Sequence, residues 1–207
     1  MKVKYFILTT LLAIFLSGCQ VTATDRINYN YNTYDNNLNR YDIQNILTTI
    51  FQTKKTLDYA AILAPDSSPY ISGYLNIIYN NYDFSETLYI SAGSNSLWLN
   101  DPKLRYSSSL KNLTYNYFVD TTSLIYNYDF RGTLKNQEMG TITFTTIDDF
   151  YGYNHQHPYQ GSLRVKHYQG TIYLDVIDEY NVNIIFDSRY GRGYDLNFRT
   201  TWYALEF

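Results

Sequence analysis

The sequence predicts a mainly β protein, an antiparallel meander that forms a curved sheet, a half-barrel or a small barrel. One amphipathic helix near the N-terminus is expected to pack on it. From Tyr70 onward, apolar residues recur at every second position in short runs, which is the period of a half-buried strand. Turn residues separate these runs at short intervals, as in a meander. Aromatic residues make up 18% of the 207 positions, with 25 tyrosines, and aromatic side chains favour strands.

The first 18 residues have the pattern of a secretory signal peptide. Lys2 and Lys4 give it a positive start, and an apolar run from Tyr5 to Leu16 follows, interrupted only by two threonines. A run of about twelve apolar residues is too short to cross a bilayer, which needs about twenty, and has the length of a secretory apolar region. We therefore predict that residues 1–18 are removed on export.

The apolar run ends in Leu16-Ser17-Gly18-Cys19, which resembles the lipobox of bacterial lipoprotein precursors. The resemblance implies cleavage before Cys19 and acylation of its thiol, for example with palmitate, so that lipid anchors the mature protein to a membrane. An ordinary signal peptide that contains a cysteine is the alternative. Cys19 is the only cysteine, and acylation removes a free thiol from an oxidising compartment. Gln20 follows, instead of the aspartate typical of inner-membrane retention, which favours the outer membrane of a bacterial envelope.

Residues 19–40 are predicted to form a lipidated tether, and residues 41–207 a single β-rich domain. The tether is crowded with Asn and lacks an apolar period. A flexible coil of about twenty residues has an end-to-end distance of roughly 25 Å; an interaction arm built on its tyrosines is the alternative. Loss of Lys2 and Lys4 changes the formal charge from −3 to −5. Because nucleic acids need a basic face, we expect no nucleic-acid partner.

A stripe of helical period predicts a helix over residues 41–55. The apolar residues of the stripe are Ile43, Ile46, Leu47, Ile50 and Phe51. Asn39 or Asp42 is expected to cap its start, and Lys54 and Lys55 to lie at its negative C-terminal end. Residues 60–64 either extend the helix or lead into a strand, and Pro65 stops it.

About eight or nine short strands are predicted after the helix. Their alternating runs are residues 71–79, 88–92, 113–119, 124–130, 140–147, 161–168, 170–177, 182–187 and 194–205. In the last run, Trp202 is expected to share an inner face with Leu196, Phe198, Thr200 and Ala204. Trp98 is expected at the rim. A single helix must lie against one face of such a meander or cap one end of it.

Neither candidate metal site has suitable ligands. His155 and His157 alternate on an extended chain and could share a cation, but Pro158 marks a hairpin loop, and no carboxylate has ligand spacing. In DSRYGRGYD, residues 187–195, arginines stand where a calcium loop needs oxygen ligands, and a glycine hairpin accounts for the same residues. We expect no metal and no cofactor.

The acidic pairs are not predicted to be catalytic. Asp148 and Asp149 are neighbours that point to opposite faces of a strand, and Asp175, Asp178 and Glu179 lead into a turn. Neither a nucleophile elbow nor a phosphate-binding loop nor a zinc-protease motif is present in the sequence. We therefore expect that the protein is not an enzyme.

The segment from residue 161 to residue 205 resembles the C-terminal part of uncharacterised exported β-rich proteins of proteobacteria. The matching positions are Gly161, Ser162, Leu163, Gly193, Thr201, Trp202 and Leu205. The acidic turn of those proteins is replaced here by SRYGRG. The resemblance implies a strand meander and no known activity.

Three functional hypotheses follow. The first is a membrane-anchored lipoprotein with a non-enzymatic interaction or structural domain, since Tyr and Asn suit adaptable recognition surfaces. Its partner is an envelope protein or a lipid. The second is a half-barrel carrier that shelters a lipid or another hydrophobic ligand. Its apolar face is predicted to comprise Trp202, Phe198, Leu196, Phe51 and Ile50.

The third hypothesis is an outer-membrane β-barrel, because Tyr203, Leu205 and Phe207 alternate into a terminal aromatic residue. Several expected strands are shorter than the nine to eleven or so residues that cross a bilayer. The three hypotheses predict different structures. A carrier has a continuous internal cavity, an interaction module exposes aromatic rings in one patch, and a barrel closes with an outward apolar band.

Overall fold

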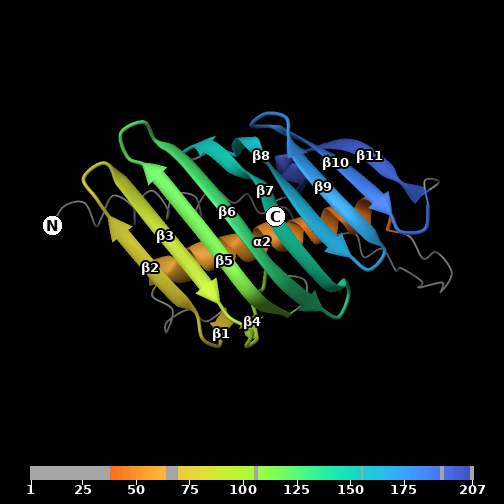
Figure 1. Ribbon diagram of the computed structural model, residues 1–207, viewed down its shortest axis with the longest axis horizontal. Helices are drawn as coiled ribbons and strands as arrows, with labels where there is room; N and C mark the ends of the chain where they lie inside the picture. Colours follow the sequence, from red (N-terminus) through yellow and green to blue (C-terminus); the bar gives the residue numbers. More distant parts are fainter. Residues whose placement is uncertain (1–37, 64–69, 105–106, 155, 192–193, 206–207) are drawn as a thin grey trace. The chain divides into compact units, whose positions relative to one another are not determined.

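The computed structural model describes residues 38–63, 70–104, 107–154, 156–191 and 194–205. It has an antiparallel sheet with one helix packed against one face (Figure 1). The predicted mainly β class and the helix-on-sheet arrangement are confirmed. The predicted signal peptide, Cys19 and most of the predicted tether lie outside the described residues.

The strands follow one another around the sheet with few exceptions. They are β1 (Ile71–Ser72), β2 (Asn76–Asn81), β3 (Ser85–Ala92), β4 (Leu97–Leu99), β5 (Ser108–Asp120), β6 (Ile125–Asn136), β7 (Gly140–Tyr153), β8 (Pro158–His167), β9 (Gly170–Val176), β10 (Asn181–Ser188) and β11 (Leu196–Thr201). From β5 to β11, each strand pairs with the next. The sheet is not closed, so the closed barrel required by the third hypothesis is not the observed form.

The strands are more numerous than expected, and several are longer. β5, β6 and β7 have 13, 12 and 14 residues. The sequence predicts a strand that ends at residue 130 and another that begins at residue 140, but the turn between them needs only residues 137–139. Asn136 closes it from the end of β6, because its side-chain oxygen accepts the backbone N–H groups of Glu138 and Met139. The polar residues before the turn therefore stay in the strand.

The helix α2 (Arg40–Leu63) begins at a reciprocal cap. The Asn39 side chain accepts the N–H groups of Tyr41 and Asp42, and the Asp42 carboxylate accepts the N–H of Asn39. Both predicted capping residues are therefore used, and Arg40, assigned to the tether, is helical. Residues 60–63 extend the helix, so the prediction that Lys54 and its neighbour end it is wrong.

A bend in β5 allows two strands to pair along the same side of it. β4 pairs with residues 108–110 and β3 with residues 113–120. Between them the register shifts, and Asn112 has a φ of 51°, a conformation that Asn tolerates better than most residues. The Asn112 N–H donates to the Gly93 carbonyl at 2.9 Å. The sheet therefore widens at this end, where β2 is the outermost strand beside β3.

The helix and one face of the sheet enclose the core. α2 crosses behind the strands, with its start near β11 and its second half near β5 (Figure 1). We call the face that it covers the inner face and the opposite one the outer face. The five residues of the predicted stripe are at most 4% exposed. Phe51 lies about 6 Å from the rings of both Phe130 and Phe150, which anchors the helix to β6 and β7.

The chain ends differently from the prediction. β11 stops at Thr201, and residues 202–205 form a 3-10 turn, η3 (Trp202–Leu205). Trp202 is therefore not on a strand face with Leu196, although it is buried, and Ala204 is exposed. The Trp202 N–H extends the ladder by donating to the Tyr180 carbonyl at 3.0 Å, and the Ala204 N–H donates to the Thr201 hydroxyl at 3.3 Å at the start of the turn. No helix in the described part of the chain has both the length and the apolar character that crossing a membrane requires.

Candidate functional site

The residues predicted to shelter a ligand are packed core. Phe51 meets Trp202 edge-on, with ring centroids 5.2 Å apart, and the Trp202 indole N–H donates to the Pro158 carbonyl at 3.2 Å. Ile50 is fully buried beside Phe51 on the helix, and only 2% of Trp202 is exposed. These side chains fill the space between helix and sheet, where a carrier needs an opening.

The other two predicted residues lie at the margin of this core. Leu196 and Phe198 of β11 are partly buried against it. The Arg40 guanidinium lies over the Phe198 ring, 4.7 Å from its centroid. Arg40 also donates to the carbonyl of Arg199 at 3.2 Å. The start of the helix therefore covers β11 with a charged side chain.

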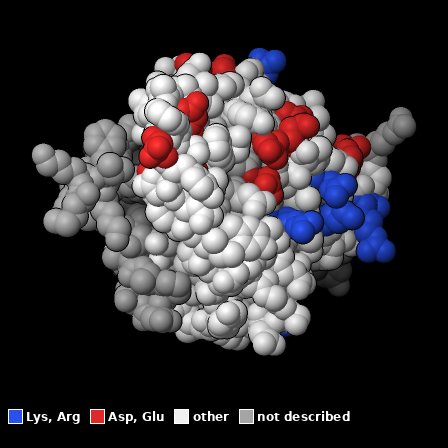
Figure 2. Space-filling model, turned by 60° about the vertical axis from the view of Figure 1, so that its left-hand side comes forward, with Lys and Arg blue, Asp and Glu red and all other residues white. Residues whose placement is uncertain are grey.

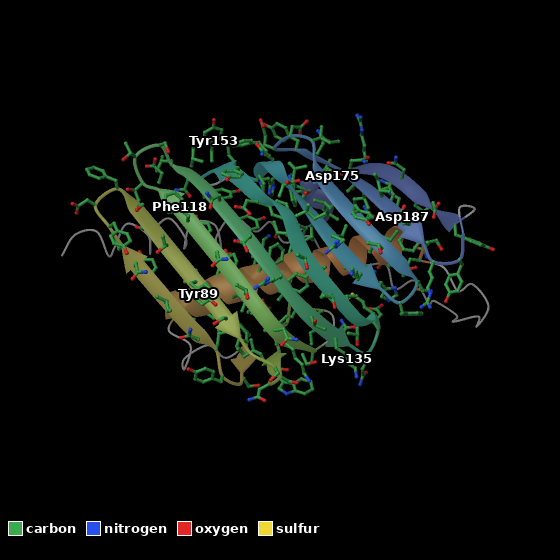
Figure 3. All side chains as sticks on the ribbon, in the orientation of Figure 1. Tyr89, Phe118, Lys135, Tyr153, Asp175 and Asp187 are labelled. Carbon is green, nitrogen blue, oxygen red and sulfur yellow. The ribbon has the colours of Figure 1, made fainter. Side chains whose placement is uncertain are left out.

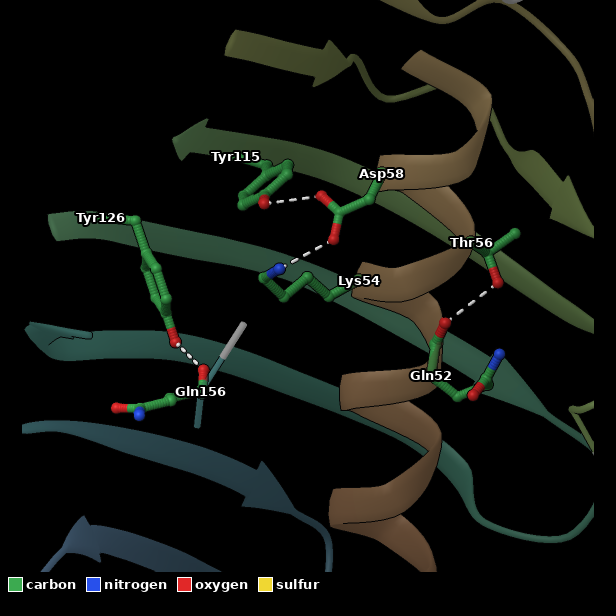
Figure 4. Close-up of polar contacts among 7 residues, drawn as sticks. All are labelled: Gln52, Lys54, Thr56, Asp58, Tyr115, Tyr126 and Gln156. Atoms are coloured by element: carbon green, nitrogen blue, oxygen red, sulfur yellow. Dashed lines mark hydrogen bonds and ion pairs between the residues drawn. The ribbon is translucent and has the colours of Figure 1, made fainter. Parts of the chain in front are cut away.

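A charged pair lies against tyrosine rings where the helix passes β5 and β6 (Figure 4). Lys54 pairs with Asp58 at 2.8 Å, and its ammonium lies 4.5 Å from the centroid of the Tyr128 ring. The Tyr115 hydroxyl donates to the other Asp58 oxygen at 2.7 Å. Burial, and then the Asp58 charge, raises the pKa of Tyr115. These groups satisfy one another, so we assign them a structural role.

Further polar contacts fix the helix and the loop after β7. The Thr56 hydroxyl donates to Asp101 at 2.7 Å and to the Gln52 carbonyl at 2.9 Å, and the Gln52 amide also donates to Asp101. Figure 4 shows the bond from the Tyr126 hydroxyl to the Gln156 carbonyl, 2.8 Å long. The buried polar groups near the helix are thus used in packing.

The two histidines that the structure describes, His157 and His167, have different neighbours. The His157 ring stacks on Trp202 at 5.9 Å, while His167 donates through Nε2 to the Met139 carbonyl at 3.0 Å. Burial lowers the pKa of His167. His155 lies outside the described residues. Among the residues that are described, no group of three or more histidines, cysteines or acids could hold a metal.

The acidic candidates stabilise turns and a bulge. The Asp148 carboxylate accepts the Ser162 hydroxyl at 2.7 Å. Asp178 accepts the N–H groups of Tyr180 and Asn181, each at 2.8 Å, and these bonds lower its pKa. Gly191 lies in the connection between β10 and β11. Its φ is 111°, a conformation that favours glycine, as predicted for a hairpin at this position.

The outer face is largely polar (Figure 3). Two open hollows, of about 450 and 290 Å³, lie where the bulges of β5 and β6 distort the sheet. Threonines line both, together with Arg131. Tyr89 and Phe118 are exceptions to this polarity and lie toward the β2 end of the outer face (Figure 3).

Exposed aromatic and aliphatic side chains gather at this end of the sheet. We call them the edge surface: Tyr74, Ile78, Tyr79, Tyr82, Phe84, Tyr89 and Phe118, which are 36–80% exposed. The only charged residues of the β2–β3 hairpin are Asp83, in the turn, and Glu86, which is buried. Figure 2, which brings this end forward, shows a broad uncharged area below the acidic atoms and to the left of the basic ones.

Three strands end the sheet: the two-residue strand β1, β2 and β11. β2 and β11 are protected differently. β11 carries Arg199, and Arg40 binds its backbone. β2 contains neither a charge nor a proline, the two residue types that commonly block pairing at an exposed edge. Within the described residues β2 pairs only with β3. Its far side therefore offers backbone groups beside the edge surface.

Sequence reasoning missed this surface because alternation alone does not tell which strand ends a sheet. The same tyrosine pattern occurs in β5 and β6, where it is largely buried. The two resemblances noted from the sequence remain predictions. Comparison of the chain with protein-family models, with curated proteins and with solved structures gave no match.

Proposed function

We propose that the chain is a bacterial lipoprotein, anchored through Cys19 to the outer membrane, whose β-rich domain is a non-enzymatic interaction module. The observation that carries the second half of the proposal is the edge surface: exposed aromatic and aliphatic side chains on and beside the β2–β3 hairpin, whose only charged residues are Asp83 in the turn and the buried Glu86. Contiguous exposed apolar surface of this kind marks interaction sites in soluble domains. The partner is a protein of the envelope.

The packing of the interior supports an interaction module over a carrier. The helix fills the inner face with large side chains, among them Phe51 and Trp202. Asp148, Asp178 and His167 make hydrogen bonds that stabilise a bulge, a turn and the packing of the sheet.

The anchor is tested by Cys19→Ser. The variant is expected to lose labelling by palmitate in cells and to leave the membrane fraction, because the thiol is the proposed site of acylation. Ser17→Thr, which keeps the cysteine, is the control for expression. Palmitate labelling that persists in Cys19→Ser would contradict the anchor.

The interaction surface is tested by a photocrosslinking amino acid at position 84, with position 180 as the matched control. Phe84 and Tyr180 are 71% and 67% exposed, but only Phe84 belongs to the edge surface. In living cells, position 84 is expected to give one discrete protein adduct and position 180 none. Equal or absent adducts at the two positions would remove the basis for an interaction module.

A further inference from the structure

The residues on one face of β2 and its flanks read the same in both directions. Taking every second position, they are Tyr74, Asn76, Ile78, Asn80 and Tyr82. Ile78 is the centre, and it is 47% exposed. An antiparallel pair of identical strands with a two-fold axis at Ile78 therefore places like residues opposite each other. From this we infer that the β2 edge pairs with the β2 edge of a second copy of the chain.

The backbone of β2 supports this register. The Tyr82 N–H donates to the Ser85 carbonyl across the hairpin at 2.8 Å. Because bonded and non-bonded pairs alternate in an antiparallel ladder, the even-numbered residues of β2 face β3 with their backbone groups. Ile77, Tyr79 and Asn81 then present N–H and C=O groups to the free side.

The two-fold register satisfies these free groups. It places Ile77 opposite Tyr79 of the second copy, and this pair exchanges two hydrogen bonds on each side of the axis. Ile78 meets Ile78 of the second copy as a non-bonded pair, in which the Cα atoms approach to about 4.5 Å. Within each copy, Tyr89 of β3 lies directly opposite Ile78, so the join is apolar at the axis and is flanked by pairs of asparagines. No like charges meet along it, since β2 is uncharged.

β11, at the far end of the sheet, is protected against pairing of this kind. The Trp202 N–H donates to the Tyr180 carbonyl, so by the same alternation the backbone groups of Arg199 face the free side of β11. Arg40 donates to the Arg199 carbonyl, one of the backbone groups on that free side. The β11 edge is thus closed by a cation, whereas the β2 edge is neutral and self-complementary.

The expected area makes this a weak dimer. A fully buried aromatic side chain removes about 150–250 Å² of surface from water. Five half-exposed side chains of the edge surface would therefore bury on the order of 500 Å² per copy in the dimer. A standard interface buries about 800 Å² per partner. Tethering two weak modules to one surface raises their effective concentration. The inference rests on the proposed function and names its partner as a second copy held on the same membrane.

A disulfide tests the register in the full-length, membrane-bound chain. In Ile78→Cys, the two new thiols face each other at the axis within the range of about 4.4–6.8 Å between Cα atoms that a disulfide spans. Ile147→Cys is the matched control, because Ile147 is 53% exposed on β7 and lies away from the β2 edge. Under mild oxidation we expect about tenfold more covalent dimer from Ile78→Cys than from Ile147→Cys or the parent chain. Equal yields would overturn the inference.

A charged substitution at position 78 provides a second test. Ile78→Lys brings two cations together at the axis, so the membrane-bound chain should lose the homodimer adduct of a photocrosslinking amino acid at position 84, while Ile147→Lys should crosslink like the parent. A dimer that persists in a folded Ile78→Lys chain would overturn the inference. If position 84 still crosslinks to a different protein while Ile78→Cys gives no dimer, the second copy is excluded and the interaction module stands. Failure of both tests removes both proposals.

Discussion

Glu86 is the residue whose surroundings conflict most with its charge. It is buried on the inner side of β3, and the Tyr79 hydroxyl donates a hydrogen bond to its carboxylate. Burial raises the pKa of Glu86 above its ordinary value of 4.5, while the bond from Tyr79 partly offsets the increase. Burial and the Glu86 charge together raise the pKa of Tyr79 to about 12.

This geometry predicts the pH dependence of stability. The folded state holds the Glu86 proton more tightly than the unfolded state. The contribution of Glu86 to the free energy of unfolding is therefore fully present below pH 4.5 and is lost as pH rises through the folded pKa. Glu86→Gln should therefore raise the free energy of unfolding at pH 7, and the gain should shrink toward pH 4. Urea unfolding at both pH values measures this, with Glu179→Gln as the control. A gain that is independent of pH would contradict the assignment.

Gly161 and Ser162 show why a motif can be visible in a sequence while its role is not. Gly161 has a φ of 137°, and a Cβ there would lie 2.8 Å from the Cα of Phe150. Ser162 binds Asp148 across the same bulge, and Leu163 is fully buried. The motif behind the weak resemblance therefore maintains a bulge, which alternation cannot reveal.

Among the elements, the helix was predicted best where periodicity determines burial. Its apolar stripe could be identified because a face that packs on a sheet repeats every three or four residues. Its end could not, because Lys54 resembles a C-terminal cation and instead pairs with Asp58 over the tyrosine rings of β5 and β6. A local rule about helix ends was outweighed by a contact with strands more than fifty residues away.

The helix should carry much of the stability. Phe51→Ala removes a ring packed among Phe130, Phe150 and Trp202 and is expected to lower the free energy of unfolding by about 3–5 kcal/mol. Asn45→Ala, on the same helix, should change it by less than about 0.5 kcal/mol. Urea unfolding of both variants tests this. A loss below about 1 kcal/mol for Phe51→Ala would mean that the helix is not part of the cooperative core.

For the whole molecule, the sequence predicted the class, the helix and most strand positions, since these depend on local period. It did not reveal which strands lie at the edges, because that depends on pairings between distant segments. The candidate surface follows from those pairings: Ile78 alternates like any core residue, yet no described strand lies beyond it.

The filled interior has a consequence for ligand binding. In a Cys19→Ser, Trp98→Phe chain, Trp202 is the single tryptophan, and it is 2% exposed. Addition of a hydrophobic fluorescent probe or of lipid should leave the Trp202 emission unchanged, because the ring is already packed against Phe51. A saturable shift would instead show an internal binding site and favour a carrier.

The contact between Phe51 and Trp202 joins residues 151 positions apart in the chain. Contacts of such long sequence separation form late and slow the folding of a domain. As the chain is synthesised, the helix is complete long before η3. The Phe51 ring therefore has no indole to contact until Trp202 has been added. Packing around Phe51 is therefore expected to be completed last by Trp202, so that a chain truncated before Trp202 leaves one side of the Phe51 ring exposed while Phe130 and Phe150 still contact it.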